Sequence, residues 1–185
     1  MPNTLATRLW PSSHRNLGAQ LLLVLAGTAL LTLSAKVQIP FWPVPMTMQT
    51  FVVLLIGAAY GLRLGGATVL AYLGQGAAGL PVFAAGGGLA YLTGPTAGYL
   101  LGFLVAAMLV GWLAERGFCR SRVGTLATFG AGTLVIFGLG AGWLGVLFGA
   151  EVALTSGVAP FLLSEALKIA LAVAVVPLAW KLGRC

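Results

Sequence analysis

Residues 17–35 read LGAQLLLVLAGTALLTLSA, an apolar run without a charged side chain. A helix that crosses a bilayer needs about 20 mainly apolar residues, so this run predicts a membrane-spanning helix. Further runs of the same character follow, and a glycine-rich turn over residues 61–66 predicts a reversal between the second and the third. The sequence therefore predicts an all-α integral membrane protein with six transmembrane helices, over residues 17–35, 47–62, 65–79, 95–114, 125–148 and 159–181.

The composition excludes an ordinary soluble domain. Of the 185 residues, 59% are hydrophobic and 7% are charged, whereas a soluble domain has about 25% charged residues. In a soluble protein the net charge of +7 would indicate a nucleic-acid partner. Here nearly all of the Lys and Arg residues lie at the ends of apolar runs, where they act as topology signals. The expected partner is therefore the lipid bilayer and not a nucleic acid.

The basic residues predict the orientation of the chain. With six spans, both termini and the second and fourth connections lie on one side of the membrane, and only Lys36 and Lys168 fall in the other half. Because cytoplasmic segments are rich in Lys and Arg, both termini are predicted to be cytoplasmic. A single transmembrane domain over 17–181 then lies between cytoplasmic tails over 1–16 and 182–185. The basic residues on the predicted cytoplasmic side are Arg8, Arg15, Arg63, Arg116, Arg120, Arg122, Lys181 and Arg184.

The predicted outer connections are apolar and rich in Gly and Pro. The first has three prolines within residues 40–45, the second carries the glycine run 86–88, and the third, over 142–157, includes Trp143 and Glu151. Non-helical backbone at membrane depth is tolerated only where it is buried in protein or lines a cavity. We therefore expect re-entrant outer loops that enclose a chamber. The alternative is that these loops lie at the membrane surface, with their aromatic side chains among the lipid headgroups.

The chain contains three carboxylates, and they differ in context. Glu115 is next to Arg116 at the end of the fourth predicted span, which suggests an exposed local pair. Glu151 falls in an outer loop and is expected to be solvated. Glu165 and Lys168 lie inside the last predicted span at a spacing that puts both on one helix face. Because charges in a membrane helix are costly, this pair is either a self-neutralising structural pair or, as the expected chamber favours, a ligand-binding pair.

The residue inventory argues against an enzyme. The only histidine is His14, before the first span, and no Ser/His pair, metal-ligand cluster or phosphate-binding Gly-Lys-Ser/Thr motif occurs. The sequence thus predicts no catalytic residue, no metal and no cofactor, and any ATP-driven step needs another subunit. The two cysteines, Cys119 and Cys185, lack metal-ligand or disulfide spacing and are expected to be reduced and inert.

Five short motifs occur in order along the membrane region: VPMTMQT at 44–50, GLPVF at 79–83, GGG at 86–88, GPTAGY at 94–99 and PFLLSEALK at 160–168. Together they resemble the BioY family, the biotin-capture subunits (S components) of bacterial energy-coupling-factor transporters. The resemblance extends from about residue 35 to residue 180. It implies a six-helix subunit of the bacterial cytoplasmic membrane that takes up biotin with high affinity. It also implies, as further partners, a membrane coupling subunit and cytoplasmic ATPases.

The resemblance also implies a site. The family's acidic residue and lysine in the last span correspond to Glu165 and Lys168, with Glu here where Asp is common in the family. We hypothesise that Glu165 accepts a hydrogen bond from a ureido N–H and that Lys168 binds the ureido carbonyl or the tail carboxylate. Trp42, Phe83 and Tyr91 would cover the rings, under the proline-rich loop as a lid. The predicted ligand-binding residues are Glu165, Lys168, Tyr91, Phe83, Trp42, Gln49, Thr47 and Tyr72.

Two other functions stay open at this stage. The chain could capture another vitamin-like molecule, or it could be a membrane scaffold that transports nothing and in which Glu165 and Lys168 merely pair. S components often carry alanines four residues apart on the first helix for docking of the coupling subunit. Here Ala26 and Ala29 are three apart, so the mode of docking is open as well.

Overall fold

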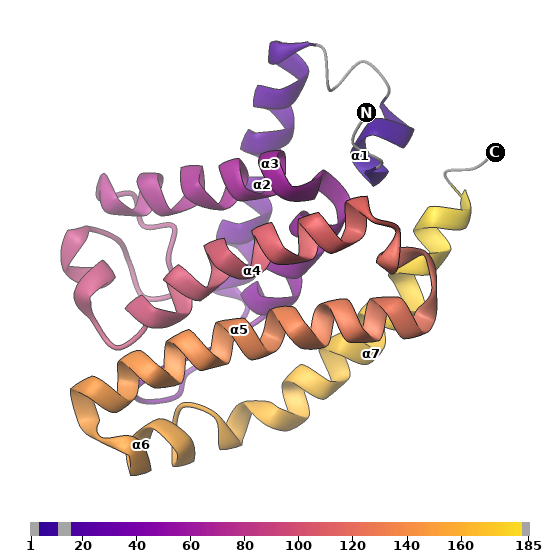
Figure 1. The fold of residues 1–185 in the computed structure, drawn as a ribbon. Coiled ribbons are helices and arrows are strands. Elements are labelled where there is room, and N and C mark those ends of the chain that lie inside the picture. Colours follow the sequence, from indigo (N-terminus) through magenta and orange to yellow (C-terminus); the bar gives the residue numbers. More distant parts are fainter. Residues whose placement is uncertain (1–3, 11–15, 183–185) are drawn as a thin grey trace.

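A computed structural model describes residues 4–10 and 16–182, and it is dominated by long helices (Figure 1). A two-stranded antiparallel hairpin pairs Gln38 with Thr47 and Ile39 with Met46. The α-helices are α1 (Leu5–Leu9), α2 (Leu17–Lys36), α3 (Gln49–Ala77), α4 (Ala97–Glu115), α5 (Arg122–Phe148), α6 (Ala150–Thr155) and α7 (Leu162–Leu182). The 3-10 helices are η2 (Leu89–Thr93), η3 (Phe118–Arg120) and η4 (Ala159–Phe161), and the strands are β1 (Gln38–Ile39) and β2 (Met46–Thr47).

Membrane-spanning segments make up most of the described chain. Five of them are long and apolar enough to cross a bilayer, which confirms the predicted all-α membrane fold. The last of the five includes α6, η4 and α7. The five segments are Leu17–Lys36, Gln49–Ala77, Ala97–Glu115, Arg122–Phe148 and Ala150–Lys181.

Helix α3 is bent sharply at Gly61, whose φ of 83° and ψ of −175° suit a residue without a side chain. The two arms, residues 49–60 and 62–77, fold back on each other. A Cβ placed on Gly65 would lie 3.2 Å from the Cα of Gly57, and the Gln49 amide donates a hydrogen bond to the Tyr72 hydroxyl. The reversal predicted over 61–66 therefore occurs at Gly61 alone. Each arm corresponds to one predicted span, and six crossings of the membrane stay a prediction.

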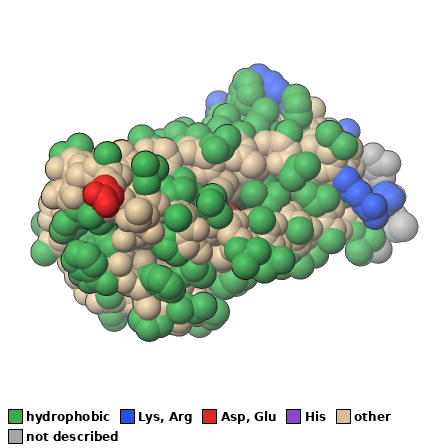
Figure 2. Space-filling model, turned by 90° about the horizontal axis from the view of Figure 1, so that it is seen from below, with side chains coloured by type: hydrophobic (Ala, Val, Ile, Leu, Met, Phe, Trp, Pro, Cys, Tyr) green, Lys and Arg blue, Asp and Glu red, His purple; other side chains and the backbone are tan. Residues whose placement is uncertain are grey.

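Helices α3 and α4 form the centre of the molecule. About 61% of the apolar stretch of α3 and 56% of that of α4 are buried, against 28% for α2 and 22% for α5. Gly57 packs on the backbone of Ala107, and Gly111 packs on the backbone at Gly61, so small residues let these two helices approach closely. Many leucines on α2, α5 and α7 are exposed and are left for lipid. Figure 2 shows hydrophobic side chains spread over one whole face of the molecule.

Figure 2 shows a cluster of Lys and Arg side chains at the right-hand end of the molecule, which we call the basic end. The guanidinium groups of Arg8 and Arg120 lie 4.9 and 5.2 Å from the centre of the Trp180 ring. Gly61 lies against Thr4. Helix α1, the bend of α3, η3 and the end of α7 therefore meet there, as the predicted grouping of basic residues requires. Arg15 and Arg184 lie outside the described residues, and the assignment of the basic end to the cytoplasm stays a prediction.

Two segments that were predicted as a tail and as a loop contain helices. Residues 5–9 of the predicted N-terminal tail form α1, where Leu5 is buried. The third outer connection, predicted over 142–157, is mostly helical, because α5 continues to Phe148 and α6 begins at Ala150. Gly149, with φ of 89°, separates the two helices, and Glu151 is exposed on α6.

The predicted pair between Glu115 and Arg116 is wrong. The carboxylate of Glu115 accepts a hydrogen bond of 2.9 Å from the backbone N–H of Leu62, the first residue after the bend in α3. The Arg116 guanidinium instead lies 3.5 Å from the centre of the Trp112 ring. Neighbouring residues on a helix point in different directions, which explains why the two do not pair. Glu115 thus satisfies an N–H group at the start of the second arm of α3, where a negative charge is favourable.

Candidate functional site

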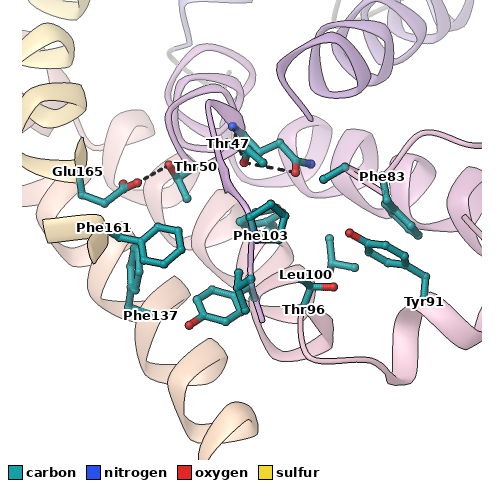
Figure 3. A pocket seen from close by; sticks show the side chains of 15 residues that line it. Thr47, Thr50, Phe83, Tyr91, Thr96, Leu100, Phe103, Phe137, Phe161 and Glu165 are labelled. Atoms are coloured by element: carbon teal, nitrogen blue, oxygen red, sulfur yellow. Dashed lines mark hydrogen bonds between the residues drawn. The ribbon is translucent and has the colours of Figure 1, made fainter. Parts of the chain in front are cut away.

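A pocket lies at the end of the molecule opposite the basic end (Figure 3). It is formed by the first turns of α3, α4 and α7, the middle of α5, the hairpin loop (residues 38–47) and the glycine loop (residues 78–96). Most of its lining is apolar or aromatic, as is usual for sites that bind small organic molecules. The lining residues are Val44, Pro45, Thr47, Gln49, Thr50, Phe83, Ala84, Tyr91, Thr96, Tyr99, Leu100, Phe103, Phe137, Phe161 and Glu165.

The pocket is narrow. The cavity between its walls has a volume of only about 40 Å³. A bicyclic ligand can therefore enter only if the lining side chains and the covering loops spread apart.

A buried ion pair stands at one wall of the pocket. The Lys168 ammonium lies 2.6 Å from Oε1 of Glu165, and the two side chains are only 8% and 7% exposed. The predicted contact across one helix face is confirmed. Thr50 joins the pair from α3: its hydroxyl donates to Oε1 of Glu165 at 2.8 Å (Figure 3). It also accepts a hydrogen bond of 2.9 Å from Lys168. Buried charges need this kind of compensation, and here the ion pair and the Thr50 hydroxyl supply it.

The two charged groups of this pair are not equally available to a ligand. Lys168 uses its three N–H groups on Glu165, on Thr50 and on the backbone oxygen of Thr47 at 2.7 Å. Both hydrogen bonds that reach Glu165 end on Oε1. Among the described residues, Oε2 of Glu165 has no partner, and Glu165 lines the pocket whereas Lys168 does not. The group offered to a ligand is therefore a hydrogen-bond acceptor.

Aromatic rings form the rest of the wall. Phe83 and Tyr91 stack with their ring centres 4.9 Å apart. On the other side, Phe137 makes edge contacts with Tyr99 and Phe161 at 5.8 and 5.7 Å. A Cβ on Gly76 would overlap the Phe83 ring, so that glycine allows Phe83 to pack against α3. The walls thus suit a flat or bicyclic apolar group.

The hairpin loop and the glycine loop cover the pocket and are tied together. Val44 and Pro45 of the hairpin loop line the pocket directly. Lys36, at the end of α2, donates a hydrogen bond of 2.7 Å to the backbone oxygen of Phe83. The side chain of Gln38 donates to the backbone oxygen of Ala84 at 3.3 Å. The proline-rich segment predicted as a lid therefore lies over the pocket, and two hydrogen bonds connect its base to the neighbouring loop.

A chain of buried hydrogen bonds runs behind the pocket. The Gln49 amide nitrogen donates to the Tyr72 hydroxyl at 2.8 Å, and that hydroxyl donates to the backbone oxygen of Val82 at 2.9 Å. Tyr72 is fully buried, and its ring meets the edge of Phe83 at 5.4 Å. Tyr72 therefore links the two arms of α3 to the glycine loop.

Five of the eight predicted site residues line the pocket: Glu165, Gln49, Thr47, Phe83 and Tyr91. The other three do not. Lys168 lies behind Glu165, and Tyr72 lies behind Gln49. Trp42, at the tip of the hairpin loop, is 74% exposed and meets the edge of Phe148 at 5.8 Å. Whether each of the eight contacts a ligand stays a prediction.

Sequence reasoning missed most of the apolar lining. Tyr99, Phe103, Phe137 and Phe161 lie within or next to apolar helices, where nothing distinguishes a pocket residue from a core residue. Thr50 could have been predicted as a site residue, because its hydroxyl lies next to Gln49 at the start of a predicted span. Among the described residues, no group of three His, Cys, Asp or Glu side chains is close enough to hold a metal ion.

Comparison with known proteins identifies the family. Residues 7–184 match the family model described as the BioY family. The chain belongs to the BioY family. This BioY chain is 38% identical to the "Probable biotin transporter BioY" of Pyrococcus horikoshii over 82% of its length and 90% of that protein. It is 39% identical to the "Biotin transporter BioY" of Thermotoga maritima, over 78% of its length and 86% of that protein.

A solved structure supports the assignment to BioY. The crystal structure of "the S-component for biotin from an ECF-type ABC transporter" resembles this BioY chain with a TM-score of 0.77 at 27% identity. The match covers 88% of this chain and 90% of that chain. The predicted S-component type of membrane fold is therefore confirmed.

Proposed function

We propose that this BioY chain is the biotin-binding S component of an energy-coupling-factor transporter. The observation that carries the proposal is the carboxylate of Glu165, paired with Lys168, in the wall of an aromatic pocket in a member of the BioY family. The names of its relatives, biotin transporters and a biotin S component, agree with it. The chain is a membrane transporter subunit rather than an enzyme.

The chemistry of biotin suits the polar wall of the pocket. Its ureido group has two N–H donors and one carbonyl acceptor, and the rest of its bicyclic body is largely apolar. Oε2 of Glu165 accepts one ureido N–H, and this bond is strong because the acceptor is charged and withdrawn from water. Lys168 acts mainly through Glu165 and Thr50, which it holds in place with its three N–H groups.

The apolar part of biotin is held by the aromatic walls. Phe83 and Tyr91 cover one side of the rings, and Phe161 covers the other. The hairpin loop must open for entry, since the pocket is too narrow for the ligand as it stands. Trp42, at the exposed tip of this loop, then folds over the bound ligand as the loop closes.

The proposed topology follows the distribution of charge. The basic end faces the cytoplasm and the pocket end faces outward, so both termini are cytoplasmic. The chain works in the cytoplasmic membrane with a membrane coupling subunit and cytoplasmic ATPases, because it contains no nucleotide-binding motif of its own. Its relatives come from bacteria and archaea, so a bacterial host stays a prediction.

Equilibrium binding tests the proposal. The purified chain in detergent is titrated with radiolabelled biotin, with and without excess unlabelled biotin. We expect saturable, competed binding with about one site per chain, as for a single pocket of this type. Unlabelled vitamins other than biotin should not compete. Competition by a different vitamin would make the chain a capture subunit for that molecule. The absence of saturable binding in a monodisperse sample would contradict the proposal and favour a scaffold.

A further inference from the structure

Gln49, in the first turn of α3, also offers a polar group to the pocket. The residue is only 4% exposed, and it lines the pocket. An amide carries an acceptor at one end and two donors at the other, so the way it is turned decides what it can bind. We infer that Tyr72 fixes this orientation, so that Gln49 presents its oxygen to the pocket and selects a ligand with an N–H donor. This inference rests on the proposed binding of biotin.

The direction of the hydrogen bonds behind the pocket settles how the amide is turned. The backbone oxygen of Val82 can only accept, so the Tyr72 hydroxyl must use its single proton on that oxygen. The hydroxyl can then only accept from Gln49. The atom of Gln49 that lies 2.8 Å from the Tyr72 oxygen is therefore the amide nitrogen, and Oε1 is directed away from Tyr72.

The surroundings of Oε1 leave it able to accept from a ligand. Its hydrogen bond within the described chain comes from the Thr47 hydroxyl at 3.5 Å, which is long and weak. Thr47 lines the pocket as well. A carbonyl oxygen has two lone pairs, so Oε1 can accept a second and shorter bond. The pocket then presents two acceptors from different helices, Oε1 of Gln49 on α3 and Oε2 of Glu165 on α7.

Two acceptors in one apolar pocket favour a ligand that brings two donors. A cyclic urea has two N–H groups, and the inference assigns one to Gln49 and the other to Glu165. A ligand without one of these donors would leave a buried acceptor unpaired, which is the strongest way for a site to reject an analogue. Tyr72 is fully buried and does not line the pocket, so it is a positioning residue that acts through Gln49.

The test uses ligands that differ in one donor. Binding to the full-length chain in detergent is measured for biotin and for two analogues, each with one ureido N–H replaced by CH2. We expect the wild type to bind each analogue about tenfold or more weakly than biotin. The Tyr72→Phe variant lacks the hydroxyl that accepts from the Gln49 amide nitrogen, so the orientation of that amide is no longer fixed. Biotin should then bind about tenfold more weakly, and the preference for biotin over one analogue should largely disappear.

Controls separate positioning from general damage. Tyr60→Phe removes a hydroxyl from the same helix at a residue that does not line the pocket, and it should keep the wild-type affinities. Gln49→Met has nearly the same size but no amide. It should lose its preference for biotin over one analogue, and this should be the same analogue for which Tyr72→Phe loses it. It also serves as the test if Tyr72→Phe fails to fold.

The outcomes distinguish the inference from the function on which it rests. If Tyr72→Phe and Gln49→Met weaken biotin and both analogues by the same factor, the inference is wrong although biotin binding stands. An unchanged affinity for all three ligands would overturn it equally. If the wild type does not bind biotin, both the proposed function and the inference fall.

Discussion

Two glutamates at opposite ends of the molecule show how differently the same side chain is used. Glu165, in the pocket wall, accepts hydrogen bonds from Lys168 and Thr50 on one oxygen, which leaves the other oxygen able to bind a ligand. Glu115, at the basic end, accepts a hydrogen bond from the backbone N–H of Leu62 beside the bend at Gly61. Both lie near the end of an apolar helix. Glu165 is buried and Glu115 is half-buried, and their hydrogen-bond partners distinguish the binding group from the structural one.

The largest effect is expected at the pocket end, where two charges depend on each other. Lys168→Met leaves the carboxylate of Glu165 buried without its cation, which should destabilise the protein by about 3 kcal/mol. Its thermal unfolding midpoint in detergent should fall accordingly. The double variant Lys168→Met with Glu165→Gln removes both charges and should recover much of this loss. If the single and double variants unfold at the same temperature, the pair is not held as described.

A smaller effect is expected at the basic end. Gly61→Ala puts a side chain at φ of 83°, next to Glu115 and Thr4, and should cost about 1–3 kcal/mol. Gly138→Ala is the matched control, because a Cβ there meets nothing within 4 Å in the middle of α5. We expect Gly61→Ala to lower the thermal midpoint while the folded protein keeps its affinity for biotin. A large loss of affinity at normal stability would show that the bend takes part in binding.

The smallest effect concerns Cys119, in η3 at the basic end. Burial raises the pKa of this thiol to about 11, so at pH 8 only about one molecule in a thousand carries the reactive thiolate. A Cys185→Ala variant, in which Cys119 is the remaining cysteine, should therefore resist iodoacetamide at pH 8, as mass spectrometry can show. The same variant unfolded in SDS should be alkylated. Fast labelling of the folded protein would mean that this end is more open than the structure indicates.

The sequence was most informative where charge interrupts apolar helices. Glu165 and Lys168 were predicted to share a helix face, and they form an ion pair. The same reasoning failed for Glu115, because adjacency in sequence says little about which way two helical side chains point. The partner of Glu115, Leu62, is 53 residues away along the chain, and no local pattern indicates it.

Aromatic residues mark the limit of prediction. Phe137 and Phe161 form part of the pocket wall, but in helices that are apolar all round they cannot be told from residues that face lipid or core. Tyr72 was predicted to contact the ligand. That contact stays a prediction, but Tyr72 does not line the pocket: the second arm of α3 packs behind the first, and the Tyr72 hydroxyl bonds to Gln49 and Val82.

The most direct test compares the two glutamates in one binding assay. Biotin affinity is measured in detergent for the wild type, Glu165→Gln and Glu115→Gln, with Glu151→Gln as an exposed control at the pocket end. Loss of a hydrogen bond to a charged acceptor is worth about 1.5–3 kcal/mol, so Glu165→Gln should bind biotin about 10- to 150-fold more weakly. Glu115→Gln and Glu151→Gln should bind like the wild type. Equal affinity in Glu165→Gln and the wild type would contradict the assignment of Glu165 as the group that binds biotin.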